Sequence, residues 1–176
     1  MADYVTLAIV SAIIVVLALV YVSIRRGLRQ RKLHFSSEAQ RAIAFARVEA
    51  EALHSSSIEP VHLLLGLLHV PIPSIISVLP LEEHERIRQE VRDRVGGGAL
   101  VTYRDDLPFS DDARQVLVAA AREARALDSP EIDAEHLLLG LLYAETSVAA
   151  LILRERGLRI ETLRERLALV PQYSPQ

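Results

Sequence analysis

The sequence contains no cysteine and a single lysine, Lys32. The absence of cysteine excludes thiol catalysis and disulfides. A nucleotide-binding P-loop needs a lysine directly after glycine, so that the lysine and the backbone amides together hold the phosphates. Lys32 follows Arg31, and the glycine triplet at residues 96–98 has no lysine after it, so we interpret the triplet as a linker. These residues therefore exclude ATP hydrolysis at a P-loop.

The longest uncharged stretch is VTLAIVSAIIVVLALVYVSI, at residues 5–24. At a rise of about 1.5 Å per residue it is long enough to cross the roughly 30 Å hydrocarbon layer. It exceeds the usual apolar part of a signal peptide, follows Asp3 rather than a basic segment, and has no small-x-small cleavage site after it. Because the run is apolar on all sides, with Tyr4 and Tyr21 near its ends, a buried core helix is the weaker alternative. We predict one transmembrane helix.

Basic residues follow this stretch and none precedes it: Arg25, Arg26, Arg29, Arg31 and Lys32. The positive-inside rule then predicts a single-pass protein of the cell membrane, with the N-terminus outside and the C-terminal body in the cytoplasm. Residues 1–32 are the expected anchor with its basic flank. These charges are expected to set topology rather than to form a specific lipid site.

The rest of the chain is a duplication. HLLLGLL occurs at residues 62–68 and again at 136–142, and the two copies align without a gap from Phe35 and Phe109 onward, with about half of the positions identical. Apolar residues recur in steps of three and four, the period of a helix. The predicted body, residues 33–170, therefore consists of repeat one (35–95), a linker (96–108) and repeat two (109–170), followed by a short tail (171–176).

Each repeat is expected to contain four helices, which makes the body all-α. Ser36 and Ser110 are predicted N-caps of the first helices. The second helices are expected to start near Pro60 and Ala134, and their HLLLGLL runs are apolar on nearly every face, so they must be central. A short and then a longer amphipathic helix follow in each repeat. Gly66 and Gly140 inside the second helices are expected to permit a close helix crossing.

Catalytic motifs are missing from the repeats. There is no G-x-S-x-G, and none of the six histidines lies in an H-E-x-x-H pattern. His62 and His69 are about two helical turns apart, but Tyr143 replaces His69 in the second copy, so we expect no metal site and no cofactor. His62 and His136 are predicted to make one structural hydrogen bond each. The chain is predicted not to be an enzyme, with an enzyme of unrecognised site as the alternative.

From residue 35 onward the chain carries fifteen arginines and 22 acidic residues. An acidic body disfavours nucleic acid as a partner.

The paired pattern F-S-x-x-A, E-A-x-x-L and H-L-L-L-G-L-L, present twice, resembles the Clp N-terminal repeat domain of Clp-type protein unfoldases. The resemblance covers roughly residues 35–169. It implies a double four-helix domain with pseudo-twofold symmetry that docks adaptors and substrates. The partners expected from it are proteins or peptides rather than a small-molecule substrate.

In some members of this family the domain is a receptor for phosphorylated arginine, with one pocket per repeat. The resemblance implies a second pocket of Ser110 and Glu135 and a first of Ser36 and Val61. Val61 departs from the pattern, because an apolar side chain cannot accept from a guanidinium. The alternative for Glu135 is an acid that is favoured by the positive end of its helix.

We therefore predict a non-enzymatic, membrane-anchored protein-binding module that recruits substrates, adaptors or Clp-type unfoldase machinery at the cytoplasmic face of the membrane. The alternative within the same resemblance is a regulator that competes with an unfoldase's own N-domain for adaptors.

Overall fold

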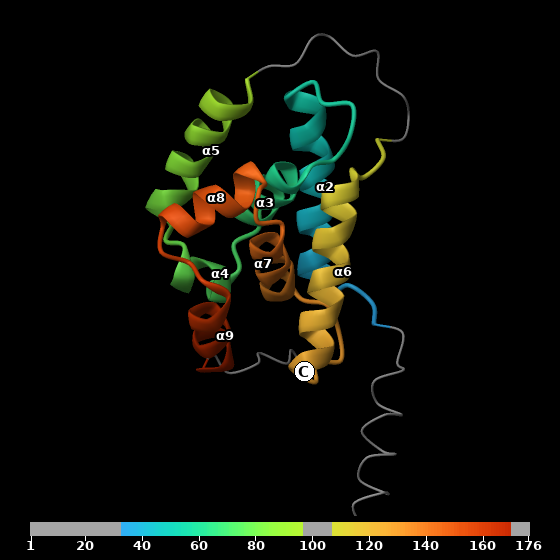
Figure 1. Cartoon of the computed structure of the whole chain (residues 1–176), viewed down its shortest axis with the longest axis vertical. Helices are drawn as coiled ribbons and strands as arrows, with labels where there is room; N and C mark the ends of the chain where they lie inside the picture. Colours follow the sequence, from blue (N-terminus) through green and yellow to red (C-terminus); the bar gives the residue numbers. More distant parts are fainter. Residues whose placement is uncertain (1–32, 97–106, 170–176) are drawn as a thin grey trace, which may run out of the picture. The chain divides into compact units, whose positions relative to one another are not determined.

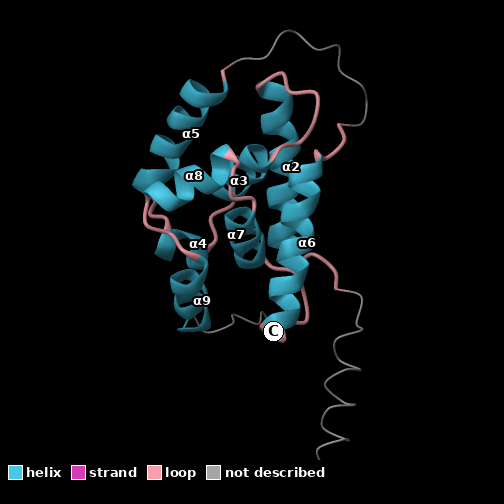
Figure 2. Ribbon diagram, in the orientation of Figure 1, coloured by secondary structure: helices cyan, strands magenta, loops and turns pink. Residues whose placement is uncertain are grey.

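The computed structural model describes residues 33–96 and 107–169, which contain eight α-helices and no strand (Figure 2). The all-helical prediction is thereby confirmed for these ranges. All eight helices belong to one compact unit that begins at His34. In chain order they are α2 (Ser37–Ala52), α3 (Pro60–His69), α4 (Pro73–Val78), α5 (Leu81–Val95), α6 (Asp111–Ala126), α7 (Ala134–Tyr143), α8 (Val148–Glu155) and α9 (Ile160–Leu169).

Three predicted features lie outside the described residues: the transmembrane stretch 5–24 with its flank Arg25, Arg26, Arg29, Arg31 and Lys32, the greater part of the linker 96–108, and the tail 171–176. Among the helices of the described ranges, no single one has both the length and the apolar composition needed to cross a bilayer.

The first helices of the two repeats start and end alike. The Ser36 hydroxyl accepts from the Ala39 amide at the start of α2, and the Ser110 hydroxyl accepts from the Ala113 amide at the start of α6. Both N-cap predictions are confirmed. One residue beyond the C-caps, His54 and Asp128 both have φ of 54°, the left-handed conformation that commonly terminates a helix.

The second helices, α3 and α7, form the centre of the domain. They pack against each other, with α2 and α6 on one side of them and the shorter helices and α5 on the other (Figure 1). Every residue of α3 except the last is buried, as is every leucine of α7. The central position predicted from the HLLLGLL runs is confirmed.

A close helix crossing occurs in each repeat at the central glycine. A Cβ on Gly66 would overlap the Ala42 carbonyl oxygen of α2, and a Cβ on Gly140 would lie 2.5 Å from the Val116 carbonyl oxygen of α6. Only a residue without a side chain lets the two backbones approach this closely. The packing role predicted for both glycines is confirmed.

Two short parallel bridges connect the repeats reciprocally. Phe35 pairs with Ile132, through hydrogen bonds from the Ser36 amide to the Ile132 carbonyl (3.1 Å) and from the Ile132 amide to the His34 carbonyl (2.8 Å). The second bridge joins the equivalent residues with the repeats exchanged: Ile58 pairs with Phe109. The Ile58 amide donates to the Pro108 carbonyl, and the Ser110 amide donates to the Ile58 carbonyl. The entry segment of each repeat is thus held by the loop before the central helix of the other.

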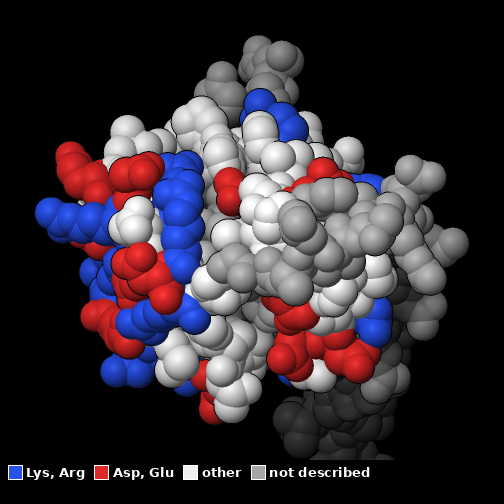
Figure 3. Space-filling model, turned by 90° about the horizontal axis from the view of Figure 1, so that it is seen from above, with Lys and Arg blue, Asp and Glu red and all other residues white. Residues whose placement is uncertain are grey.

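Charged side chains of both signs are interleaved on the face seen from above, most clearly along its left side (Figure 3). Ion pairs also connect the two repeats. Arg156, just after α8, pairs with Glu83 (3.0 Å) and Glu90 (2.8 Å) of α5, and Arg94 of α5 pairs with Glu155 (2.6 Å) of α8. These pairs join the last helix of repeat one to the third helix of repeat two.

Leu64 and Leu138 test the central position of α3 and α7, since both side chains are fully buried. Truncation of either to alanine should lower the free energy of unfolding by about 2–5 kcal/mol, through lost burial and the cavity left behind. Leu151 on α8, which is 44% exposed, is the matched control and should lose less than about 1 kcal/mol. Urea denaturation followed by circular dichroism measures all three. If the free energy of unfolding fell no more for the Leu64 and Leu138 variants than for the Leu151 variant, the packing described above would be contradicted.

Candidate functional site

The structure places the predicted pocket residues of repeat two at two different helix starts. Ser110 caps α6, while Glu135, in the first turn of α7, accepts a hydrogen bond from the Ser74 hydroxyl of α4. The Ser74 side chain is buried, and the bond joins residues of different repeats. No hydrogen bond among the described residues joins Ser110 to Glu135. The guanidinium pocket therefore stays a prediction, and Ser74 already bonds one oxygen of its carboxylate.

The equivalent residues of repeat one are less suited to a charged ligand. Ser36 is buried with its hydroxyl engaged in the cap of α2, and Val61 is 5% exposed. Val61 also offers no acceptor. Of the two predicted pockets, only the one at Glu135 carries a charge.

The two repeat histidines occupy the third position of the central helices. The Nδ1 atom of His62 accepts from the Glu59 amide at 2.8 Å, and Nδ1 of His136 accepts from the Asp133 amide at 2.9 Å. Each ring thus satisfies the backbone donor of its helix N-cap, and the structural hydrogen bond predicted for each histidine is confirmed. An accepting Nδ1 places the proton of the neutral ring on Nε2. The Nε2 atom of His62 is buried and finds no partner among the described residues.

Burial lowers the pKa of His62 from its usual value near 6.5 to about 4, because an imidazolium here would lose its hydration. Nearby carboxylates, Glu59 first, oppose the shift without cancelling it. Burial also lowers the pKa of His136, against the opposing carboxylates of Asp133 and others. Protonation of either Nδ1 would in addition break the bond to the N-cap amide. Both rings are therefore neutral structural groups at pH 7.

The glutamate of each E-A-x-x-L motif contacts the last residue of the neighbouring central helix. In repeat one, Glu49 of α2 meets Nε2 of His69 at 2.5 Å. In repeat two, Glu123 of α6 accepts from the Tyr143 hydroxyl (2.7 Å) and from two nitrogens of Arg164 on α9 (2.6 and 2.8 Å). The two pairs stand at equivalent positions. Among the residues that the structure describes, a third helix joins the pair of repeat two and not that of repeat one.

The Arg164 guanidinium, followed by the Tyr143 hydroxyl, lowers the pKa of Glu123, whose side chain is almost completely buried. Burial and the hydrogen bond to Glu123 raise the pKa of Tyr143. The arrangement keeps a buried carboxylate ionised and fully bonded, as buried charges require. Its geometry is that of a structural ion pair that fixes α9 to α6 and α7.

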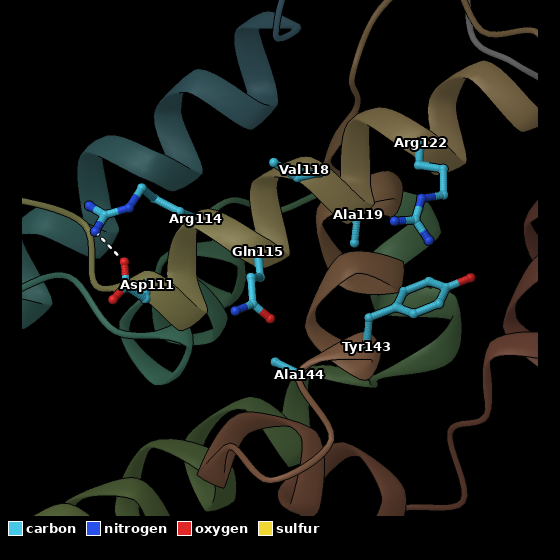
Figure 4. Close-up of a pocket in the computed structure, with 8 residues that line it drawn as sticks. All are labelled: Asp111, Arg114, Gln115, Val118, Ala119, Arg122, Tyr143 and Ala144. Atoms are coloured by element: carbon cyan, nitrogen blue, oxygen red, sulfur yellow. Dashed lines mark hydrogen bonds and ion pairs between the residues drawn. The ribbon is translucent and has the colours of Figure 1, made fainter.

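A hollow of about 600 Å³ lies beside this cluster (Figure 4). One stripe of α6 lines it, through Gln115, Val118, Ala119 and Arg122, and Tyr143 closes it at the end of α7. The sequence analysis did not identify this hollow, because Ala119, the small residue beneath it, is an ordinary residue of an amphipathic helix. The available signal was the alignment of the repeats, in which Ala119 stands opposite Phe45.

No group of three or more histidine, aspartate and glutamate side chains in the described part of the chain is placed to hold a metal ion. The features available for function are thus the helix start at Glu135 and the hollow over α6.

Comparison with known proteins identifies similar sequences. The model of the Clp repeat (R) N-terminal domain matches residues 34–155 and 108–176. The ClpC ATP-binding subunit of an ATP-dependent Clp protease from Staphylococcus saprophyticus is 34% identical over 131 residues, which are 73% of this chain and 16% of that protein. The negative regulator of genetic competence ClpC/MecB of Bacillus subtilis is 29% identical over 136 residues, again with 16% of its length covered. The chain thus matches about a sixth of the length of these relatives.

Solved structures show the same fold. The N-terminal domain of the Clp protease-associated chaperone ClpD from Arabidopsis thaliana matches with a TM-score of 0.63 at 25% identity, over 77% of this chain and 92% of that one. The Hsp104 N-terminal domain from Candida albicans matches with a TM-score of 0.61 at 20% identity, over 77% of this chain and 90% of that one.

The two buried histidines predict a loss of stability on acidification. Their pKa values are lower in the folded than in the unfolded chain, so the contribution of each is complete above about pH 6.5 and is lost as the pH falls, for His62 toward about pH 4. Each should lower the free energy of unfolding by up to about 1.4 kcal/mol per pH unit in this window. Urea titrations between about pH 7 and 5 measure the slope.

His62→Asn and His136→Asn should each reduce this slope, because asparagine offers an acceptor without titrating. His34→Asn, at an exposed position, is the control and should keep the wild-type slope. A wild-type slope in both His62→Asn and His136→Asn would show that other groups cause the acid sensitivity.

Proposed function

The chain belongs to the Clp repeat (R) N-terminal domain family, and we propose that it is a membrane-anchored docking module that binds proteins or peptides and recruits them, or Clp-type unfoldase machinery, to the cytoplasmic face of the membrane. The observation that carries the proposal is the complete double repeat: both copies have their four helices, and the family model matches both. In Clp unfoldases this domain is a protein-interaction module.

Binding rather than catalysis is the proposed mode of action. The polar groups of the candidate site are engaged in structure: both serines cap helices, both histidines bond N-cap amides, and Glu123 is held by Arg164 and Tyr143. None of these is arranged as a nucleophile beside a general base. The described surface instead offers an acidic group at Glu135 and a hollow with exposed apolar and cationic side chains.

The membrane part of the proposal depends on the sequence of residues 5–24 and its basic flank. An anchor would confine the binding domain to a layer near the membrane and raise its effective concentration toward membrane-bound partners.

A second candidate function has the same structural basis. Because the domain is 34% identical to the corresponding part of a ClpC subunit, it could share partners with such a subunit and compete with it. A competition assay with an isolated ClpC N-terminal domain and one of its adaptors distinguishes recruitment, in which the adaptor bridges both proteins, from competition, in which the two exclude each other.

Cell fractionation tests the anchor. The full chain should stay with membranes through a high-salt wash and be released by detergent, because about 20 buried apolar residues hold it. A fragment of residues 33–176 should be soluble and helical by circular dichroism. Release of the full chain by salt alone would show that only the basic flank holds it.

Pull-down from detergent-treated membranes tests the docking function. The full chain should enrich a defined set of proteins relative to a control in which residues 1–33 are joined to an unrelated folded domain. Mass spectrometry identifies the proteins, and enrichment of Clp components or their substrates is the expected result. Equal capture by both baits would contradict a role for the double repeat.

A further inference from the structure

The two repeats provide an internal comparison of the surface beside the motif glutamates. In repeat one the ring of Phe45 on α2 stacks on the ring of His69, with centroids 4.9 Å apart and planes 17° from parallel. Phe45 is 39% exposed, so its ring covers the outer side of His69. In repeat one an aromatic side chain of α2 thus lies against the last residue of α3.

Repeat two has the same backbone but not the same ring. Ala119 stands in the place of Phe45 and Tyr143 in the place of His69, and the hollow of about 600 Å³ lies over them (Figure 4). A hollow of this size is within the range of ligand-binding clefts, roughly 300–1,000 Å³. Beside Ala119, the Val118 side chain is 62% exposed and extends the apolar surface.

Arg122 contributes a positive charge to the rim of the hollow, which is also lined by Asp111 and Arg114. Its guanidinium carbon lies 6.0 Å from the centre of the Tyr143 ring, and it makes no hydrogen bond or ion pair with the described residues. Arg114, at the other end of the hollow, bonds the Asp111 carboxylate and the Phe109 carbonyl. Arg122 therefore supplies a positive charge that no carboxylate among the described residues pairs with, whereas Arg114 is paired with Asp111.

We propose that this hollow binds an aromatic side chain of a partner polypeptide together with an acidic residue next to it. The ring lies against Tyr143, as Phe45 lies against His69, and the carboxylate pairs with Arg122. Ala119 and Arg122 are three residues apart on α6 and so share one face, which places the two contacts side by side. A flat ring under a guanidinium also gains a cation–π contact that an aliphatic side chain lacks. The proposal rests on the proposed function and names the partner chemistry.

Repeat one cannot offer the same site. Phe45 fills the position of the ring, and Val48 stands where repeat two has Arg122. One site per chain is therefore expected, and repeat one supplies matched control variants.

The probe is a fluorescein-labelled peptide with a central Phe-Asp, titrated with the full chain in detergent and followed by fluorescence anisotropy. Peptides with Ala-Asp and Phe-Lys at the centre are the ligand controls. The Phe-Asp peptide should bind with a stoichiometry of one and more tightly than either control, by about fivefold or more, since each control lacks one of the two contacts.

Ala119→Phe should abolish binding of the Phe-Asp peptide, because it gives repeat two the ring that repeat one already has. Phe45→Ala, the matched change in repeat one, should leave the affinity unchanged. Arg122→Gln, an exposed change that does not depend on how Ala119→Phe packs, should weaken the Phe-Asp peptide about fivefold or more and should not weaken the Phe-Lys peptide. Circular dichroism checks that each variant is folded.

Equal affinities of wild type, Ala119→Phe and Arg122→Gln for the Phe-Asp peptide would overturn the proposal, as would equal affinities of wild type for the three peptides. The membrane pull-down keeps this result separate from the proposed function. If Ala119→Phe enriches the same proteins as wild type, the docking function stands and the hollow is not its site.

Discussion

The close crossing of the first and second helix of each repeat is the constraint on which the other contacts depend. At Gly66 the backbone of α3 meets that of α2 at Ala42 and Ala46, and Gly140 repeats this arrangement on α6. One turn farther along each helix, the motif glutamate meets the last residue of the central helix, as Glu49 with His69 or Glu123 with Tyr143. Because backbone contact fixes the crossing point, it also places the two members of each side-chain pair next to each other.

The same constraint explains where the two repeats were free to diverge. Where the first and second helices cross, both repeats have small residues and leucines, because a larger side chain at the glycine would overlap the backbone of the facing helix. At the ends of the central helices the side chains differ: repeat one has Phe45 on His69, whereas repeat two has Ala119 beside Tyr143. The duplication thus produced two nearly equal interiors and two chemically different surfaces.

Much of the fold could be predicted from the sequence because its causes are local. Three- and four-residue spacing, serine caps and proline at a first helical turn act within one helix, so the starts at Ser37, Pro60, Asp111 and Ala134 were predictable. The gapless alignment further predicted that both copies fold alike. A structural hydrogen bond of each repeat histidine could also be predicted, because its partner is only three residues away.

The rest could not be predicted because it depends on contacts between distant residues. The bond from Ser74 to Glu135 spans 61 residues, and that from Arg164 to Glu123 spans 41, with no periodic pattern to indicate either. The N-cap role of Ser110 could be predicted from its neighbours, whereas the bond of Glu135 to Ser74 could not, and the ligand pocket of Ser110 and Glu135 stays a prediction. The alignment of the repeats shows the exchange of Phe45 for Ala119, but the hollow that lies over Ala119 and Tyr143 is seen only in the structure.

The reciprocal bridges between the repeats have a consequence for how the domain folds. In solenoid proteins each repeat contacts its neighbour along a line, and folding spreads from any point. Here the segment entering each repeat is completed by a loop of the other, between residues 35 and 132 and between residues 58 and 109. Neither half has all its backbone partners until the chain has closed across the whole domain. Such sequence-distant contacts raise the contact order, which slows folding, and a chain emerging from the ribosome can complete its first repeat only after the second has been made as far as residue 132.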